Sequence, residues 1–179
     1  AVEKAIPQGM DEPFAWGVLA LARLQSQRMK DSRRACELAR RAVEATERSR
    51  PEFLAINPNT TTAVSALLER NLRGAAPDVA WRMATGRFGA RYIVSEAAFA
   101  IAAHAALGAW ANHADGCDAV LLACFGDPGL FALRESSAVP VVGLAEASMH
   151  AAAERAGRFS IVTGGPRWRA MLERHAQAL

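Results

Sequence analysis

Residues 119–129 have the sequence AVLLACFGDPG, and this stretch decides the fold. Four apolar residues and Ala123 lead into the thiol of Cys124, and turn-forming residues follow it directly. A short apolar run that ends in such a turn is typical of a buried strand in a parallel sheet. Asp127 followed by Pro128 has the pattern of a helix N-cap and a first helical residue. We therefore predict that Cys124 lies at the carboxyl end of a strand, facing the start of a helix.

The same alternation of short apolar runs and helical segments extends along the chain from residue 51, and it predicts an α/β fold with a parallel sheet. Helices between most strands imply right-handed crossovers and a doubly wound sheet. We expect strands at Glu52–Asn57, Val79–Ala84, Asp118–Cys124, Val139–Leu144 and Arg158–Thr163. We expect helices at Thr60–Leu72, Ser95–His113, Pro128–Glu135, Ser148–Ala156 and Pro166–Gln177.

Residues 1–50 have a different texture and are expected to form a helical extension, with helices at Phe14–Met29 and Ser32–Arg48. They hold ten Lys/Arg against seven Asp/Glu, so the whole formal charge of +3 lies here. A solvated basic face is the favoured interpretation, and a helix for a partner or a membrane surface is the alternative. The balanced charge of the remaining chain argues against a nucleic-acid-binding protein.

Other compositional features exclude further classes of protein. No uninterrupted run of about 18 apolar residues is present, so we expect no membrane span. Three cysteines, Cys36, Cys117 and Cys124, are too few for a disulfide framework in a chain of 179 residues. Free thiols favour a cytoplasmic location.

The position of Cys124 suits chemistry, because open α/β sheets bind ligands at the carboxyl ends of their strands. A helix N-terminus there would lower the pKa of the thiol and could hold an anionic oxygen. Gly126 would let the backbone approach a ligand closely. Taken alone, a cysteine at a strand end is more often a small buried hydrophobic residue.

Polar residues at the ends of three other strands point to a shared crevice. They are Asn57 and Asn59 after the first strand, Glu146 and Ser148 after the fourth, and Thr163 after the fifth. For a single residue such as Ser148, ordinary helix capping is at least as good an explanation. For the set, a ligand site is favoured.

Four separated segments resemble, in order and spacing, those of the hydantoin racemase branch of the aspartate/glutamate/hydantoin racemase family. They are AINPNT at 55–60, LACFGDPGL at 122–130, PVVGLAEAS at 140–148 and GRFSIVT at 157–163. The resemblance covers Pro51 to Leu179. It implies two flavodoxin-like domains with the substrate held between two cysteines, of which Cys124 matches the first. It also places near substrate Asn57, Asn59, Phe125, Gly126, Glu146, Ser148 and, less directly, Thr163.

The implied activity is that of an isomerase: a cofactor-independent racemase of an amino-acid derivative, with a 5-substituted hydantoin as the favoured small-molecule substrate. Inversion needs two acid/base groups on opposite faces of one carbon, and a thiol/thiolate pair suits this. Backbone N–H groups and Asn or Ser/Thr side chains would stabilise the enolate-like oxygen. We expect no metal, flavin or pyridoxal. The four histidines, His104, His113, His150 and His175, are expected in surface or supporting positions.

The second family cysteine has no counterpart, since Cys117 sits at the opposite end of the predicted strand from Cys124 and is expected to be structural. We therefore expect a first racemase domain at 51–147, the beginning of a second at 148–179, and a truncated form of a racemase. An incomplete second domain would expose apolar surface, which makes a homo-oligomer plausible. The alternatives are a cysteine-dependent isomerase or decarboxylase of the same superfamily, or an inactive binding domain.

Overall fold

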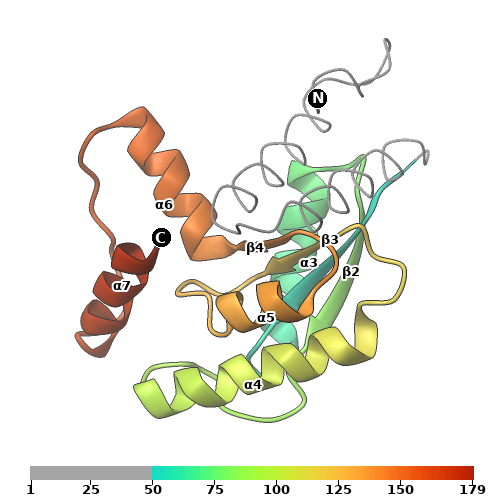
Figure 1. The fold of residues 1–179 in the computed structure, drawn as a ribbon, viewed down its shortest axis with the longest axis horizontal. Coiled ribbons are helices and arrows are strands. Elements are labelled where there is room, and N and C mark those ends of the chain that lie inside the picture. Colours follow the sequence, from blue (N-terminus) through green and yellow to red (C-terminus); the bar gives the residue numbers. More distant parts are fainter. Residues whose placement is uncertain (1–49) are drawn as a thin grey trace.

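The computed structural model describes residues 50–179, and its centre is a four-stranded parallel sheet (Figure 1). The strands are β1 (Glu52–Asn57), β2 (Ala80–Thr85), β3 (Ala119–Leu122) and β4 (Val141–Gly143), in the order β2-β1-β3-β4. The chain moves outward from β1 to β2 and then crosses back to β3. The direction of winding therefore reverses between β1 and β3, and ligands bind at such a reversal in open α/β sheets.

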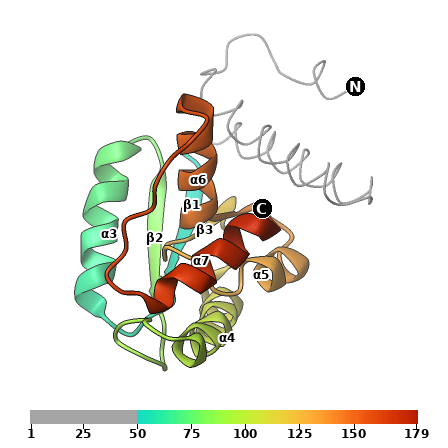
Figure 2. The same cartoon turned by 90° about the vertical axis from the view of Figure 1, so that its left-hand side faces the viewer.

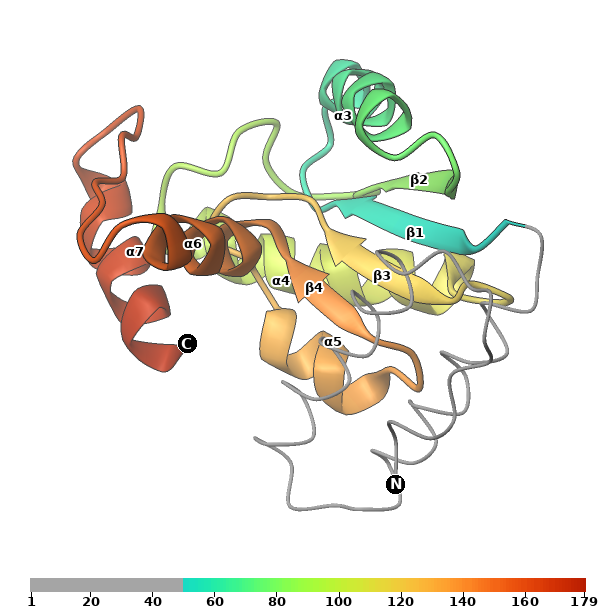
Figure 3. The same ribbon diagram turned by 90° about the horizontal axis from the view of Figure 1, so that it is seen from above.

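Helices cover both faces of this sheet, as a doubly wound fold requires. In Figures 2 and 3, α3 (Thr62–Ala75) lies on one side, and α4 (Glu96–His113) and α5 (Leu130–Ser136) lie on the other. The central strands contribute fully buried side chains such as Leu54, Ile56 and Leu122 to the core. The buried face of α4 consists of alanines, and these small side chains let the helix approach the sheet closely.

The predicted α/β fold is confirmed, and most elements lie within a few residues of their expected bounds. The first strand has the bounds predicted for it. Helix α4 was predicted to start at Ser95, and it begins one residue later, with Ser95 as its N-cap. The Ser95 hydroxyl accepts a hydrogen bond from the N–H of Ala98 at 3.2 Å. This is the side-chain cap that a serine at this position provides.

The predicted fifth strand, Arg158–Thr163, is wrong. Residues 156–166 form no strand and connect α6 (Leu144–Arg155) to α7 (Arg167–Ala178). The segment has the alternating pattern of a strand, but no described strand lies beside it to pair with its backbone. Val162 is 97% exposed, while Ile161 packs against α6 and α7.

The predicted start of the helix at Ser148 is also wrong, because α6 begins at Leu144 directly after β4. Glu146 and Ser148 therefore lie in the first turns of a helix and not in a loop. The boundary predicted between residues 147 and 148 falls inside α6. As Figure 1 shows, α6 and α7 lie beyond the carboxyl ends of the strands.

The predicted extension, with helices at Phe14–Met29 and Ser32–Arg48, lies outside the described residues. Among residues 50–179, no helix combines the length and apolar character needed to cross a membrane.

Candidate functional site

Three segments meet at the carboxyl edge of β1, β3 and β4, and the first is the loop after β1. Asn57 is fully buried, and its Nδ2 donates to Thr61 O at 3.2 Å and Ser65 Oγ at 3.0 Å. Asn59 Oδ1 accepts from Asn57 Nδ2 and from the N–H of Thr61. The buried side chain of Asn57 therefore stabilises the conformation of the loop. Asn59 is half-buried, and its Nδ2 takes no part in these hydrogen bonds.

The second segment is a tight turn that carries Cys124. The N–H of Asp127 donates to Cys124 O at 3.0 Å, and the N–H of Ala123 donates to Ile56 O at 2.8 Å. The second bond places the turn beside the end of β1. Gly126 has a φ of 109°, a left-handed conformation in which glycine is favoured. The Cys124 side chain is half-buried, and its Sγ lies 3.9 Å from Phe125 O.

The expected lowering of the Cys124 pKa is wrong. Burial raises the pKa of this thiol to about 12, and the nearby negative charge of Asp127 adds to the increase. The helix start that was expected to stabilise the thiolate is too far along the chain, since α5 begins only at Leu130. The thiol is therefore protonated at neutral pH.

This raised pKa predicts a specific pH dependence for alkylation of Cys124 by iodoacetamide. We expect the rate to rise about tenfold per pH unit through pH 10 without a plateau, because the thiolate is the nucleophile. An unperturbed cysteine would level off near its pKa of about 8.5. Fragment-ion mass spectrometry separates Cys124 from Cys117, and a plateau below pH 9.5 would contradict the prediction.

Asp127 caps a different helix from the one that the sequence predicts. Its carboxylate accepts the N–H of Ala145 at 2.9 Å and that of Glu146 at 2.8 Å, in the first turn of α6. The residue that precedes α5 is Gly129, with a φ of 85°. Asp127 could not have been assigned to α6 from the sequence, because the contact joins residues 18 and 19 positions apart.

The third segment is the start of α6, where Glu146 forms an ion pair with Arg134 of α5. Arg134 Nη1 lies 3.0 Å from Glu146 Oε1, and Arg134 Nε and Nη2 donate to Val141 O at 3.1 and 3.0 Å. Glu146 is buried and committed to this pair. Ser148 is exposed, and its hydroxyl donates to Leu144 O at 2.6 Å.

Helix α7 covers the Cys124 turn from outside. A methyl group placed on Gly126 would lie 2.9 Å from the Trp168 indole, so the ring rests against this glycine. Phe125 packs with Leu172 and Trp168 against α6. His175 Nε2 lies 2.9 Å from Asp127 Oδ2, and both side chains are buried. Neither Trp168 nor His175 could be assigned to this site from the sequence, because their helix docks through contacts between residues far apart in the chain.

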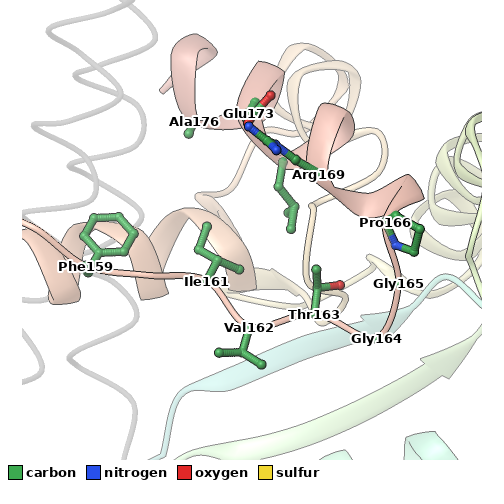
Figure 4. A pocket seen from close by; sticks show the side chains of 11 residues that line it. Phe159, Ile161, Val162, Thr163, Gly164, Gly165, Pro166, Arg169, Glu173 and Ala176 are labelled. Atoms are coloured by element: carbon green, nitrogen blue, oxygen red, sulfur yellow. The ribbon is translucent and has the colours of Figure 1, made fainter.

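Thr163 lies away from this turn, in a groove of about 870 Å³ between the segment after α6 and one face of α7 (Figure 4). Phe159, Ile161 and Leu172 give the groove an apolar wall, with Arg169 and Glu173 on the helix. Neither Cys124 nor the two asparagines line it. The structure thus brings together the segments of Asn57, Cys124 and Glu146 but not that of Thr163.

Within residues 50–179, no group of three or more His, Cys, Asp or Glu side chains is arranged to hold a metal ion.

Two solved structures are similar to this chain. An allantoin racemase from Klebsiella pneumoniae superposes with a TM-score of 0.68 at 38% identity, over 72% of this chain and 53% of that chain. An allantoin racemase from Pseudomonas fluorescens has a TM-score of 0.68 at 26% identity, over 71% and 55%. The described fold is therefore that of these racemases, and this chain spans about half of each.

Sequence comparisons agree. A hydantoin racemase from Pseudomonas sp. (strain NS671) is 54% identical over 59 residues, 33% of this chain and 24% of that protein. One from Paenarthrobacter aurescens is 54% identical over 52 residues, 29% of this chain and 22% of that protein. The sequence profile of the family described as Asp/Glu/Hydantoin racemase matches residues 54–179. The chain therefore belongs to the Asp/Glu/hydantoin racemase family.

Proposed function

We propose that this protein takes part in the racemisation of an amino-acid derivative, with a 5-substituted hydantoin, allantoin included, as the substrate class. The observation that carries the proposal is the place of Cys124, a half-buried thiol in a turn beside β1 where the winding of the sheet reverses. Membership of the family and the names of its relatives support the reaction type.

In the proposed reaction, Cys124 acts as the acid for one enantiomer of the substrate. A base on the opposite face removes the proton from C5 of the ring, and the electron pair moves onto the neighbouring carbonyl oxygen. The electron pair then returns from the oxygen to C5, which takes the proton of the Cys124 thiol on the other face, and Cys124 becomes a thiolate. The high pKa of Cys124 suits this direction, because the thiol stays protonated until the carbanion forms. In the reverse direction the two groups exchange roles.

Neighbouring groups would orient the substrate and stabilise the developing charge. Asn59 can offer its Nδ2 to the carbonyl oxygen, and Phe125 supplies an apolar surface next to the thiol. A contact between Gly126 and substrate stays a prediction from the resemblance, because the Trp168 indole rests against this glycine in the structure. Direct contacts from Asn57, Glu146, Ser148 and Thr163 stay predictions from the resemblance.

The opposing base is proposed to come from outside residues 50–179. Cys117 is unsuitable, because it precedes β3, is buried, and so lies at the other end of the strand from Cys124. This chain covers only 53% and 55% of the two racemase structures.

Solvent exchange tests the proposal directly. The two enantiomers of a 5-substituted hydantoin are incubated separately with the protein in D2O, and deuterium at C5 is followed by proton NMR above the buffer rate. We expect exchange of the enantiomer whose C5 proton Cys124 removes to fall by at least about a hundredfold in Cys124→Ser, because proton transfer by a positioned group is worth this much. Cys117→Ser is the matched control and is expected to retain the activity. Equal exchange in Cys124→Ser would remove the thiol from the mechanism.

One observation favours a second candidate, in which a single cysteine serves as an acid in a decarboxylation. Cys124 is held as a thiol, and no second cysteine faces it among residues 50–179. Loss of carbon dioxide from a substituted malonate leaves a carbanion that one thiol can protonate. Release of carbon dioxide that depends on Cys124, without exchange of a hydantoin, would select this candidate.

A further inference from the structure

Asp127 is the most thoroughly buried carboxylate near Cys124. Its side chain is 0% exposed, and it has three partners: the N–H groups of Ala145 and Glu146 and the Nε2 of His175. Its backbone closes the Cys124 turn, with its N–H on Cys124 O and its own C=O accepting from Leu130. Its φ of 52° is rare for a residue with a side chain. These contacts hold Asp127 in an unfavourable backbone conformation, and residues held in this way are often found at functional sites.

Gly143 lies on the other side of the Asp127 carboxylate, and the space there admits no side chain. A methyl group on Gly143 would lie 2.2 Å from Asp127 Oδ2, so glycine leaves the space that the carboxylate fills. The carboxylate therefore joins the Cys124 turn to the first turn of α6, where N–H groups have no partners within the helix. The anion at this helix start is also favoured by the helix dipole.

We propose that Asp127 is the positioning residue for Cys124: its carboxylate anchors the turn that carries the thiol to the N-terminus of α6, with His175 of α7 as its third partner. The inference rests on the proposed function only in giving Cys124 a reactive role. Asp127 acts through Cys124 and need not touch substrate.

The charges around the thiol come from three elements packed against the turn. Asp127 lies in the turn itself, His175 comes from α7, and Glu146 of α6 is paired with Arg134 of α5. Among these charges, that of Asp127 therefore has the most direct effect on the pKa of the Cys124 thiol. Replacing it by asparagine keeps the shape of the side chain and removes the charge.

Asp127→Asn is tested by alkylation of Cys124 with iodoacetamide between pH 8 and 10. Removing a nearby negative charge is expected to lower the thiol pKa by about one unit. The resulting tenfold gain in thiolate is partly offset by weaker nucleophilicity, which leaves a rate increase of about threefold. The ratio of the two rates should be constant over this range, because the thiol pKa stays above pH 10 in both proteins. If the substitution merely loosened the fold and exposed the thiol, the rate would instead level off near the unperturbed pKa of about 8.5.

The matched control is Asp118→Asn, which also removes a buried carboxylate. Asp118 accepts the N–H of Glu52 at 2.9 Å at the other end of β3. Burial is the main cause of the raised pKa of Cys117, and the charge of Asp118 adds to it. Each variant should therefore accelerate alkylation of its own cysteine and leave the other unchanged. An Asp127→Asn protein with an unchanged Cys124 rate overturns the proposal.

Gly143→Ala tests the anchor independently, because it displaces the carboxylate and keeps its charge. Amide hydrogen exchange of Ala145 and Glu146 is expected to accelerate about tenfold in this variant, since both N–H groups lose their acceptor. Unchanged exchange at both amides overturns the proposal even if Asp127→Asn does not fold. None of these measurements needs catalytic turnover, so a failed racemisation assay leaves the result on Asp127 intact.

Discussion

Replacing Gly143 by alanine is expected to lower the free energy of unfolding by about 3 kcal/mol or more, because hydrogen bonds to a charged acceptor are each worth about 1.5–3 kcal/mol. The new methyl group would occupy the position of the Asp127 carboxylate and separate it from the N–H groups of Ala145 and Glu146. Backbone strain does not contribute, since Gly143 has a φ of −88° that any residue adopts. Urea unfolding followed by circular dichroism measures the change.

Gly108→Ala is the matched control for this experiment. Gly108 lies inside α4, and a methyl group placed on it would meet no atom within 4 Å. The same substitution there should raise the free energy of unfolding by about 0.5–1 kcal/mol, because glycine is the poorer helix former. If the two variants have equal stability, the close contact between Gly143 and Asp127 is not what restricts position 143.

Replacing Arg134 by methionine is expected to cost about 3–5 kcal/mol of stability, the usual loss when one partner of a buried ion pair is removed. The side chains of Arg134 and Glu146 are only 13% and 11% exposed. Methionine fills much of the same space, but it leaves the Glu146 carboxylate without its cation. It also removes two hydrogen bonds to Val141 O, which fix α5 against the end of β4.

A double variant separates the charge effect from the loss of packing. Changing both Arg134 and Glu146 to methionine removes the unpaired charge, and most of the lost stability should return. The control is Arg73→Met, which breaks an exposed i,i+4 pair with Glu69 and should cost less than about 1 kcal/mol. A double variant as unstable as Arg134→Met would contradict a charge-based explanation, and thermal and urea unfolding give the comparison.

The elements whose bounds were predicted well are those with a strong local pattern. β1 is a continuous apolar run that ends at Asn57-Pro58, and α4 has a serine cap before a long alanine-rich segment. In both elements, the residues that mark the end of the strand or the start of the helix adjoin that element in the sequence. The position of Cys124 at the end of β3 followed for the same reason, since the apolar run and the turn adjoin it.

Predictions failed where a distant partner decides the structure. The pattern of Arg158–Thr163 favours a strand, but a strand needs a neighbour to accept its hydrogen bonds, and none is present among the described residues. The sequence around Asp127 resembles a cap for the next helix, yet its carboxylate is held by α6 and His175. The shift of the Cys124 pKa was predicted in the wrong direction, because the depth at which the thiol is buried and the place of the Asp127 carboxylate beside it depend on the tertiary structure.

The chain's own sequence determined its family, the parallel α/β fold and the thiol at a strand end, because each depends on residues close together in the chain. Tertiary structure alone decided that Asp127 anchors this turn, that Glu146 pairs with Arg134, and that α7 covers the site. These contacts depend on how helices dock, and docking is set by side-chain packing across the whole domain. A buried charge is stable only where several distant groups converge on it, and that convergence is not written in any single stretch of residues.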